Sequence, residues 1–219
     1  MDEQYIAQVN RFFPDLIDRI DAQYPAFSVP IVPEADAGLQ SCFYNVERKV
    51  TRDGGKLIYG WAIRFSEFMI EAEMHAIWQS EVGVYLDVTP PIVPLLHTVF
   101  IRDERLVFNG KVIDNVRINI SGNPMVDDWI RIKESINRVF AYGDRKAEHI
   151  VDLPEAIVPL LAELEEIDNF FLPFITGMGN DSSRCFCGRD FEYQHCHGRW
   201  IRVELNRQME EVAAYMKTA

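Results

Sequence analysis

The sequence predicts an α+β fold in which packed helices cover an antiparallel sheet, followed by a small C-terminal zinc knuckle. Three observations predict it. Strand-like alternation fills the middle of the chain, helical spacing flanks it on both sides, and three of the 4 cysteines fall close together near the C-terminus. We therefore expect two domains: residues 1–176 form the α+β domain, and residues 177–219 form a hinge, the knuckle and a last helix.

The first segments are an amphipathic helix, a loop and a short second helix. Apolar residues recur at three- and four-residue steps from Glu3 to Tyr24, which is the spacing of a helix with one buried face. Three prolines between residues 25 and 33 predict an extended loop, since proline lacks a backbone donor and has a fixed φ. A helix is then expected from Ser41 to Val50, with Ser41 as its N-cap.

Alternating polar and apolar residues, many of them β-branched or aromatic, predict the strands of the sheet. The expected strands are Lys56 to Phe65, Met69 to Trp78, Gly83 to Val88, His97 to Ile101, Arg105 to Phe108 and Lys111 to Ile120. Asn109 and Gly110 form a predicted hairpin turn between the last two strands. Hairpin connections join antiparallel neighbours, so the sheet is expected to be antiparallel.

Helical spacing returns after Pro124. The expected helices are Val126 to Tyr142, Leu153 to Phe174 and, near the end of the chain, Trp200 to Lys217. Asp127 and Asp128 lie in the first turn of the first of these helices, where acidic side chains favour the dipole and usually face solvent. The composition of residues 177–183 predicts a flexible hinge.

The charge of the chain limits the classes of partner. With 22 basic and 34 acidic residues the formal charge is −12, which repels nucleic acid phosphates, so we expect no nucleic-acid partner. No apolar run approaches the roughly 20 residues of a membrane helix, and the acidic N-terminal segment is unlike a signal peptide. We expect a cytoplasmic protein without a membrane partner.

A zinc site is predicted from the crowded cysteines. Cys185 and Cys187 precede Cys196 by one short loop, and histidines stand on both sides of Cys196. In a reducing compartment, thiolates and imidazole at this spacing suit tetrahedral zinc better than a disulfide framework. The alternative is that these cysteines are buried apolar residues without a metal.

This segment resembles the SEC-C motif, a Cys-x-Cys pair followed after eight residues by Cys-His or Cys-Cys. Gly188 and Tyr193 agree with further positions of that motif. The resemblance implies Cys185, Cys187, Cys196 and His197 as the ligands, and it leaves His195 outside the ligand set. Four protein ligands close the coordination sphere, so Zn²⁺ is expected to be structural or to support docking of a protein partner.

Cys42, the one cysteine outside the knuckle, is therefore the candidate catalytic nucleophile. It lies at the predicted start of a helix, where unpaired amides and the helix dipole stabilise a thiolate. A hairpin centred on residue 81 would place Asp87 directly opposite His75. A carboxylate beside an imidazole fixes its tautomer and stabilises the imidazolium, so Cys42, His75 and Asp87 form a predicted catalytic triad. Gln40 is a candidate oxyanion donor.

Residues 38–91 resemble the transglutaminase-like and arylamine-acetyltransferase branch of papain-fold enzymes. The resemblance rests on the order of Cys42, His75 and Asp87, on Ala76 and Trp78 after the histidine, and on Thr89 and Pro90 after the aspartate. It implies a papain-like or transglutaminase-like fold and an acyl-enzyme intermediate. Hydrolysis, deamidation and acyl transfer all use that intermediate, and the substrate would be a peptide, amide or acyl compound.

Three other interpretations stay open. Cys42, His75 and Asp87 can be packed structural residues. Alternatively, Glu73, His75 and Asp87 can be oxygen and nitrogen ligands for a divalent cation, with Cys42 uninvolved. The third is a non-catalytic adaptor whose knuckle docks a protein partner.

Overall fold

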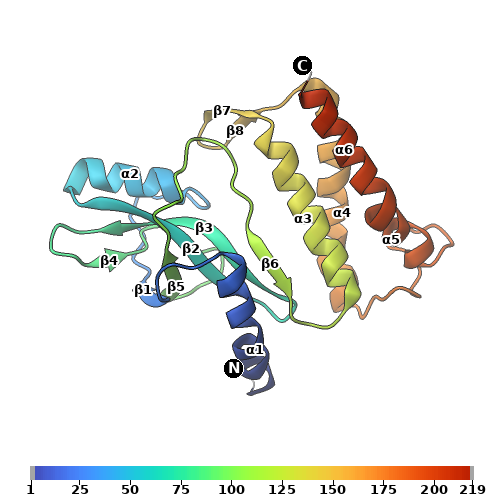
Figure 1. Ribbon diagram of the computed structural model, residues 1–219, viewed down its shortest axis with the longest axis horizontal. Coiled ribbons are helices and arrows are strands. Elements are labelled where there is room, and N and C mark those ends of the chain that lie inside the picture. The colour runs from blue at the N-terminus through green and yellow to red at the C-terminus, as the bar shows by residue number, and fades with distance from the viewer. Residues whose placement is uncertain (1–2, 218–219) are drawn as a thin grey trace. The chain divides into compact units, whose positions relative to one another are not determined.

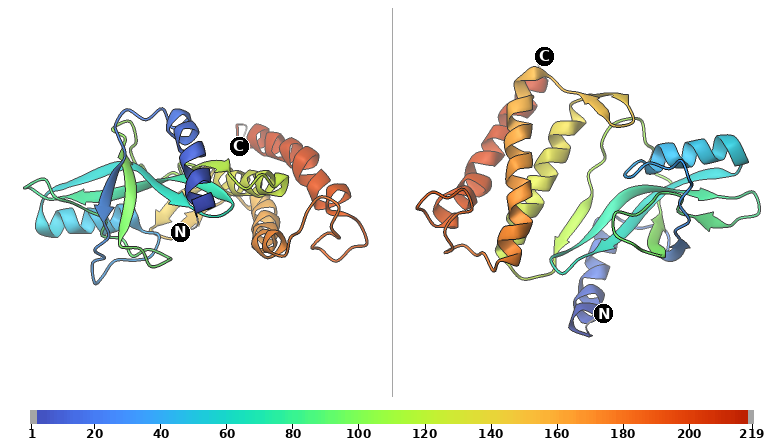
Figure 2. Two further views of the ribbon diagram at one scale, coloured as in Figure 1. Left: turned by 90° about the horizontal axis from the view of Figure 1, so that it is seen from below. Right: turned by 180° about the vertical axis from the view of Figure 1, so that it is seen from behind.

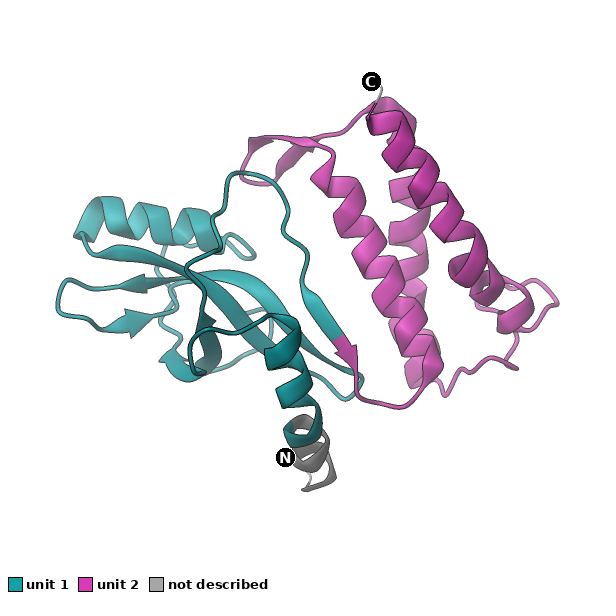
Figure 3. Ribbon diagram, in the orientation of Figure 1, with its two compact units in different colours: residues 1–117 teal, residues 118–219 magenta. Residues whose placement is uncertain are grey.

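The computed structural model describes residues 3–217, and the chain divides into two compact units, residues 1–117 and residues 118–219 (Figure 3). The first unit contains the sheet. The expected boundary at residues 176 and 177 falls inside the second unit, and each unit is described separately below. Within residues 3–217, no helix has both the length and the apolar character needed to cross a membrane.

The sheet of the first unit has the strand order β1-β5-β2-β3-β4, and β6 also pairs with β3 (Figure 1). The pairs β1–β5, β5–β2, β2–β3 and β3–β4 are antiparallel, as predicted. The strands are β1 (Phe27–Pro30), β2 (Lys56–Phe65), β3 (Met69–Gln79), β4 (Tyr85–Leu86), β5 (His97–Arg102) and β6 (Val116–Asn119).

The alternation of side chains along β2 and β3 gives the sheet two apolar faces. On one face, helix α2 (Cys42–Asp53) packs Val46 against Ala76 and Val88. On the other face, Val29, Ile58, Ile77 and Phe100 form a second buried cluster. The sheet is therefore buried on both sides around its central strands, which holds His75 in a dry environment.

The end of β1 and the residues directly after it lie beside the residue that follows β4. Ile31 and Asp87 form a parallel bridge there, and the amide of Asp87 donates to the carbonyl of Pro30 at 2.9 Å. The amide of Val32 donates in turn to the carbonyl of Asp87 at 2.8 Å. These hydrogen bonds fix the backbone of Asp87 beyond the end of the short strand β4.

Several predicted elements differ from the structure. The expected strand Arg105 to Phe108 and the hairpin turn after it are wrong, because residues 103–115 form a loop. Its first turn is held by Asp103, whose carboxylate accepts from Trp61 Nε1 at 3.1 Å and from the side chain of Arg105 at 2.8 Å. Strand β1 lies where a proline-rich loop was expected, and helix α1 (Glu3–Arg19) continues through Pro14.

The second unit is built on helices that lie side by side (Figure 2). α3 (Pro124–Ala141) packs against α4 (Val158–Thr176), and the hairpin β7 (Asp144–Ala147) and β8 (Ile150–Asp152) connects them. The last helical segment begins earlier than predicted, as α5 (His197–Arg199), a π-helical turn (Trp200–Glu204) and α6 (Leu205–Met216). α4 belongs to this unit because its aromatic side chains pack against the cysteine segment: Phe170, Phe171 and Phe174 all contact Phe186.

Candidate functional site

Cys42 is the first residue of α2 and is 7% exposed. The helix begins there because the carbonyl of Ser41 accepts the amide of Asn45 at 2.8 Å. Ser41 occupies the predicted N-cap position, but its hydroxyl donates to the carbonyl of Leu39 at 3.1 Å instead of capping the helix. The thiol therefore lies at the positive end of the helix dipole, where a thiolate is stabilised.

His75 lies on β3, paired with Gly60 of β2, and is buried. Its Nε2 atom is 2.9 Å from Oδ2 of Asp87. Burial by itself lowers the pKa of His75, but the charges of Cys42 and Asp87, together with the hydrogen bond to Asp87, hold that pKa well above its ordinary value. The thiol of Cys42 is therefore close enough to interact with the imidazole ring.

Both carboxylate oxygens of Asp87 are engaged. Oδ2 binds His75, and Oδ1 accepts the backbone amide of Thr89 at 3.1 Å. The buried carboxylate is thus held at both oxygens, which fixes its orientation toward the imidazole.

The predicted register between β3 and β4 is wrong by two residues, although the predicted centre of the hairpin is wrong by only one. Trp78 pairs with Leu86 and Gln79 with Tyr85, so the hairpin is centred on residue 82 and not on residue 81. A continued ladder would place Asp87 opposite Ile77. Asp87 reaches His75 diagonally because its backbone leaves β4 and binds the segment after β1.

Two further residues belong to this network. Sequence reasoning missed Asn45, and it singled out Thr89 only by its position after Asp87, without these contacts. Asn45, one helical turn after Cys42, donates to Oγ1 of Thr89 at 3.1 Å. Thr89 follows Asp87 by two residues, which is the spacing of an Asx turn. The signals in the sequence were an asparagine inside a helix, where its propensity is low, and the Asp-x-Thr spacing.

An aromatic cluster stands beside the start of α2. The ring of Phe43 stacks on Phe108 at 4.1 Å between centroids, and Tyr44 meets Phe108 edge-on. Phe108 belongs to the loop of residues 103–115, which passes the N-terminal end of α2 (Figure 1). Burial raises the pKa of Tyr59, which lies close enough to Cys42 to sense its charge.

The second candidate site is the cysteine cluster, whose four predicted ligands converge. Cys185 Sγ lies 3.1 Å from Nδ1 of His197, Cys187 Sγ lies 3.6 Å from Cys196 Sγ, and Cys196 Sγ lies 3.7 Å from Nδ1 of His197. All four ligand atoms lie within 4.8 Å of one another. Tetrahedral zinc requires about 3.8 Å between two sulfurs and about 3.6 Å between sulfur and nitrogen, so this set fits the ion.

The protonation of the cluster also suits a metal. Burial and the neighbouring thiols raise the pKa of Cys196 to about 12, because two adjacent thiolates repel each other. A dication at the centre removes that repulsion. Burial lowers the pKa of His197, which keeps its imidazole neutral and able to coordinate. His195 is exposed and lies outside the cluster.

A buried polar network supports the knuckle. The hydroxyl of Tyr193 donates to Asp128 Oδ2 at 3.0 Å, and Arg202 binds both Asp128 and Asp181 at 2.7 Å. Asp128 was expected on a solvated face and is buried. The expected hinge is also tied down, since the carbonyl of Asp181 accepts the amide of Gln194 at 3.0 Å.

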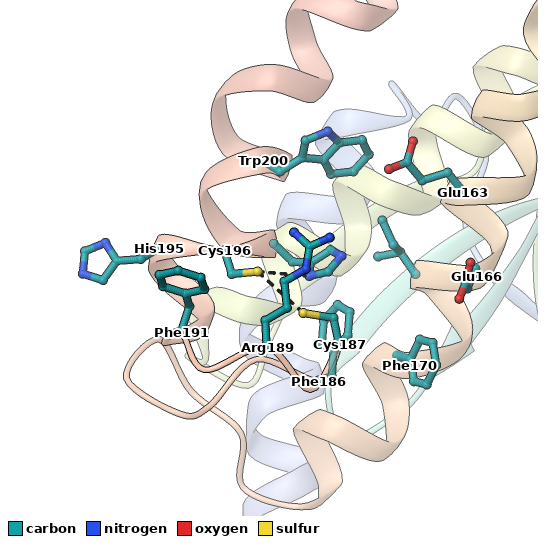
Figure 4. Close-up of a pocket in the computed structure, with 12 residues that line it drawn as sticks. Glu163, Glu166, Phe170, Phe186, Cys187, Arg189, Phe191, His195, Cys196 and Trp200 are labelled. Atoms are coloured by element: carbon teal, nitrogen blue, oxygen red, sulfur yellow. Dashed lines mark hydrogen bonds between the residues drawn. The ribbon is translucent and has the colours of Figure 1, made fainter.

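A pocket of about 620 Å³ opens beside the cluster in the second unit. Its lining includes Phe170, Phe191 and Trp200, with Glu163 and Glu166 on α4 and Arg189 on the knuckle loop (Figure 4). The side chain of Phe191 is 60% exposed. The pocket therefore joins an aromatic surface to charges of both signs.

A divalent cation at Glu73, His75 and Asp87 is not supported. Glu73 binds Arg64 at 2.8 Å. Among residues 3–217, the cluster of Cys185, Cys187, Cys196 and His197 is the single group of three or more potential ligands close enough to share an ion.

The comparisons with known proteins give no family. No protein-family model, curated protein or solved structure matches the chain. The function must therefore be inferred from the geometry.

Proposed function

We propose that the protein is a thiol enzyme that acts on an amide or acyl bond through Cys42, His75 and Asp87, and that its zinc knuckle is structural. One observation carries the proposal: a buried imidazole lies 2.9 Å from a buried carboxylate and close enough to a helix-terminal thiol to interact with its charge. The resemblance of residues 38–91 to transglutaminase-like enzymes supports the same roles.

The proposed reaction begins when the thiol proton of Cys42 moves to His75 and the imidazolium is stabilised by Asp87. The thiolate attacks the carbonyl carbon, and the tetrahedral intermediate collapses to a thioester as His75 protonates the leaving amine or alcohol. Water or an amine, deprotonated by His75, then attacks the thioester and releases the acyl group. The amide of Cys42, at the start of α2, is a donor for the developing oxyanion.

The first test is the pH dependence of Cys42 alkylation by iodoacetamide, followed by mass spectrometry of the Cys42 peptide so that the knuckle cysteines do not contribute. In the parent protein the midpoint should lie below that of His75→Ala, because the imidazole accepts the thiol proton. A midpoint unchanged by His75→Ala would overturn the proposal.

The second test traps the intermediate. The parent chain, incubated with an activated acyl ester such as p-nitrophenyl acetate, should carry the acyl group on the Cys42 peptide. His75→Ala should accumulate it more slowly by about 10²-fold or more, since general base catalysis contributes that much. Acylation of Cys42 at equal rates in both proteins would mean that His75 does not act as a catalytic base.

The zinc assignment supports a second function, protein docking, through the aromatic pocket beside the cluster. A photo-crosslinking amino acid at position 191 tests it, with position 107 as a control because Val107 is equally exposed at 61%. Docking predicts one partner crosslinked from position 191 alone and lost with Trp200→Ala. The same crosslinks from both positions would exclude a specific surface.

A further inference from the structure

Asn45 lies on α2 one turn after the nucleophile and is 2% exposed. Its Nδ2 donates to the carbonyl of Gly38 at 2.8 Å and to Oγ1 of Thr89 at 3.1 Å. Its Oδ1 accepts the amide of Gly38 at 3.0 Å. Both ends of the amide are therefore used, and a carboxylate or an aliphatic side chain could not make the same set of bonds.

The two bonds to Gly38 hold the loop that leads into Cys42. Two residues before the thiol, Gln40 has a φ of +57°, a left-handed conformation that costs energy for a residue with a side chain. The hydroxyl of Ser41 donates to the carbonyl of Leu39, which closes the same turn. Asn45 thus stabilises a strained loop immediately before the nucleophile.

The third bond leads to the other side of the site. Thr89 accepts from Asn45 through its hydroxyl, and its backbone amide donates to Oδ1 of Asp87 at 3.1 Å. Asp87 binds His75 with its second oxygen. A single buried amide is therefore linked both to the loop that carries Cys42 and to the carboxylate that orients the imidazole.

We infer that Asn45 is a positioning residue. It holds the loop of residues 38–41, which leads into Cys42, in a fixed position relative to the Asp87 carboxylate, so that Cys42 and His75 stay aligned for proton transfer. The inference rests on the proposed function. It assigns Asn45 no contact with substrate. Thr89 is the second member of this link, through its hydroxyl.

If Asn45 had a purely structural role, its loss would lower stability without changing the ionisation of the Cys42 thiol. The decisive measurement is therefore the pH profile of Cys42 alkylation. The groups that surround the thiol are His75 and Tyr59, with Asp87 behind His75 and Glu47 near Tyr59. Arg48 also contacts Oδ1 of Asn45. Neither Asn45 nor Thr89 titrates, so a shift of the profile reports their effect on the other groups.

The experiment measures the pH profile of Cys42 alkylation by iodoacetamide, by mass spectrometry of the Cys42 peptide, in the full chain with its metal. The variants are Asn45→Ala, Thr89→Val and Thr89→Ser. Asn119→Ala is the matched control, since Asn119 makes a comparable local set of bonds to Asn123 and Ser121 in the second unit. We expect Asn45→Ala and Thr89→Val to raise the midpoint by about one pH unit. Thr89→Ser, which keeps the hydroxyl, should have the midpoint of the parent protein.

The outcomes separate the two proposals. A midpoint that depends on His75 but not on Asn45 or Thr89 overturns this inference and leaves the thiol enzyme standing. A midpoint that does not depend on His75 overturns the proposed function itself. If Asn45→Ala does not fold, the comparison of Thr89→Val with Thr89→Ser decides: equal midpoints in these two variants overturn the inference.

Discussion

His75 Nε2 and Asp87 Oδ2 lie 2.9 Å apart, although the two residues are not partners in the β3–β4 ladder. The contact depends on a bridge from Asp87 to Ile31, a residue that lies far away in the sequence. Both side chains are buried, so the pair is shielded from water and from salt. Its geometry is therefore a property of the whole sheet and not of one hairpin.

The first prediction concerns the pH dependence of stability. The pKa of His75 is higher in the folded protein than its ordinary value of 6.5. Protonation of His75 therefore stabilises the fold: the contribution is fully present below about pH 6.5 and is lost as the pH rises through the folded pKa. Asp87→Asn should lower the free energy of unfolding by about 2 kcal/mol at pH 6 and by less at high pH.

Denaturant unfolding of the parent and of Asp87→Asn between pH 6 and pH 10 checks this prediction. Glu73→Gln is the control, because Glu73 lies on the same strand in a partly exposed pair with Arg64. It should cost less than about 1 kcal/mol. A deficit of Asp87→Asn that grows as the pH rises would contradict the assigned direction of the His75 pKa.

The second prediction concerns the metal. The purified chain should contain one zinc ion per molecule, measured by elemental analysis, and Cys196→Ser should lower both zinc content and thermal stability. His195→Ala should keep the full zinc content, because His195 is exposed and outside the cluster. Loss of zinc in His195→Ala with retention in His197→Ala would reverse the ligand assignment.

Much of the fold follows from local patterns in the sequence. β2 was predicted at its observed limits, and β3 and β5 each to within one residue, because alternation over many residues is a strong signal. The convergence of the cysteine cluster follows from its short spacing, and all four residues meet as expected. The N-cap position of Ser41 before α2 was also predicted, although its side chain does not cap the helix.

The predictions that were wrong concern features that depend on contacts between residues distant in the sequence. Strand β1 forms by pairing with β5, and Asp87 leaves the β3–β4 ladder for a bridge to Ile31. No local pattern encodes either contact. Asp128 has the local signature of a solvated helix start, and it is buried because Tyr193 and Arg202 supply its hydrogen bonds. The link from Asn45 to Thr89 is hidden for the same reason.

The third prediction tests that buried network. Tyr193→Phe removes the hydroxyl that donates to Asp128, while the ring keeps its aromatic contacts with Phe171 and Phe174. We expect a loss of about 1–3 kcal/mol in the free energy of unfolding, because Asp128 stays buried with one donor fewer. Phe191→Ala, at an exposed aromatic position, should cost less than about 0.5 kcal/mol. Similar small effects in both variants would show that the network does not stabilise the knuckle.

The fourth prediction concerns Gly60, the β2 residue opposite His75. A Cβ atom there would lie 2.2 Å from the carbonyl oxygen of Ile101 and 2.5 Å from the ring of Phe100. β2 and β5 would have to separate, so Gly60→Ala should destabilise the protein by about 3 kcal/mol and slow Cys42 alkylation as His75 shifts. Gly83→Asn is the control, because the space around Gly83 is open and the cost there is limited to the backbone strain at its φ of +86°, which asparagine bears better than most residues. Calorimetric unfolding of both variants measures the effect, and a Gly60→Ala protein as stable as Gly83→Asn would mean that the sheet can relax at the position facing His75.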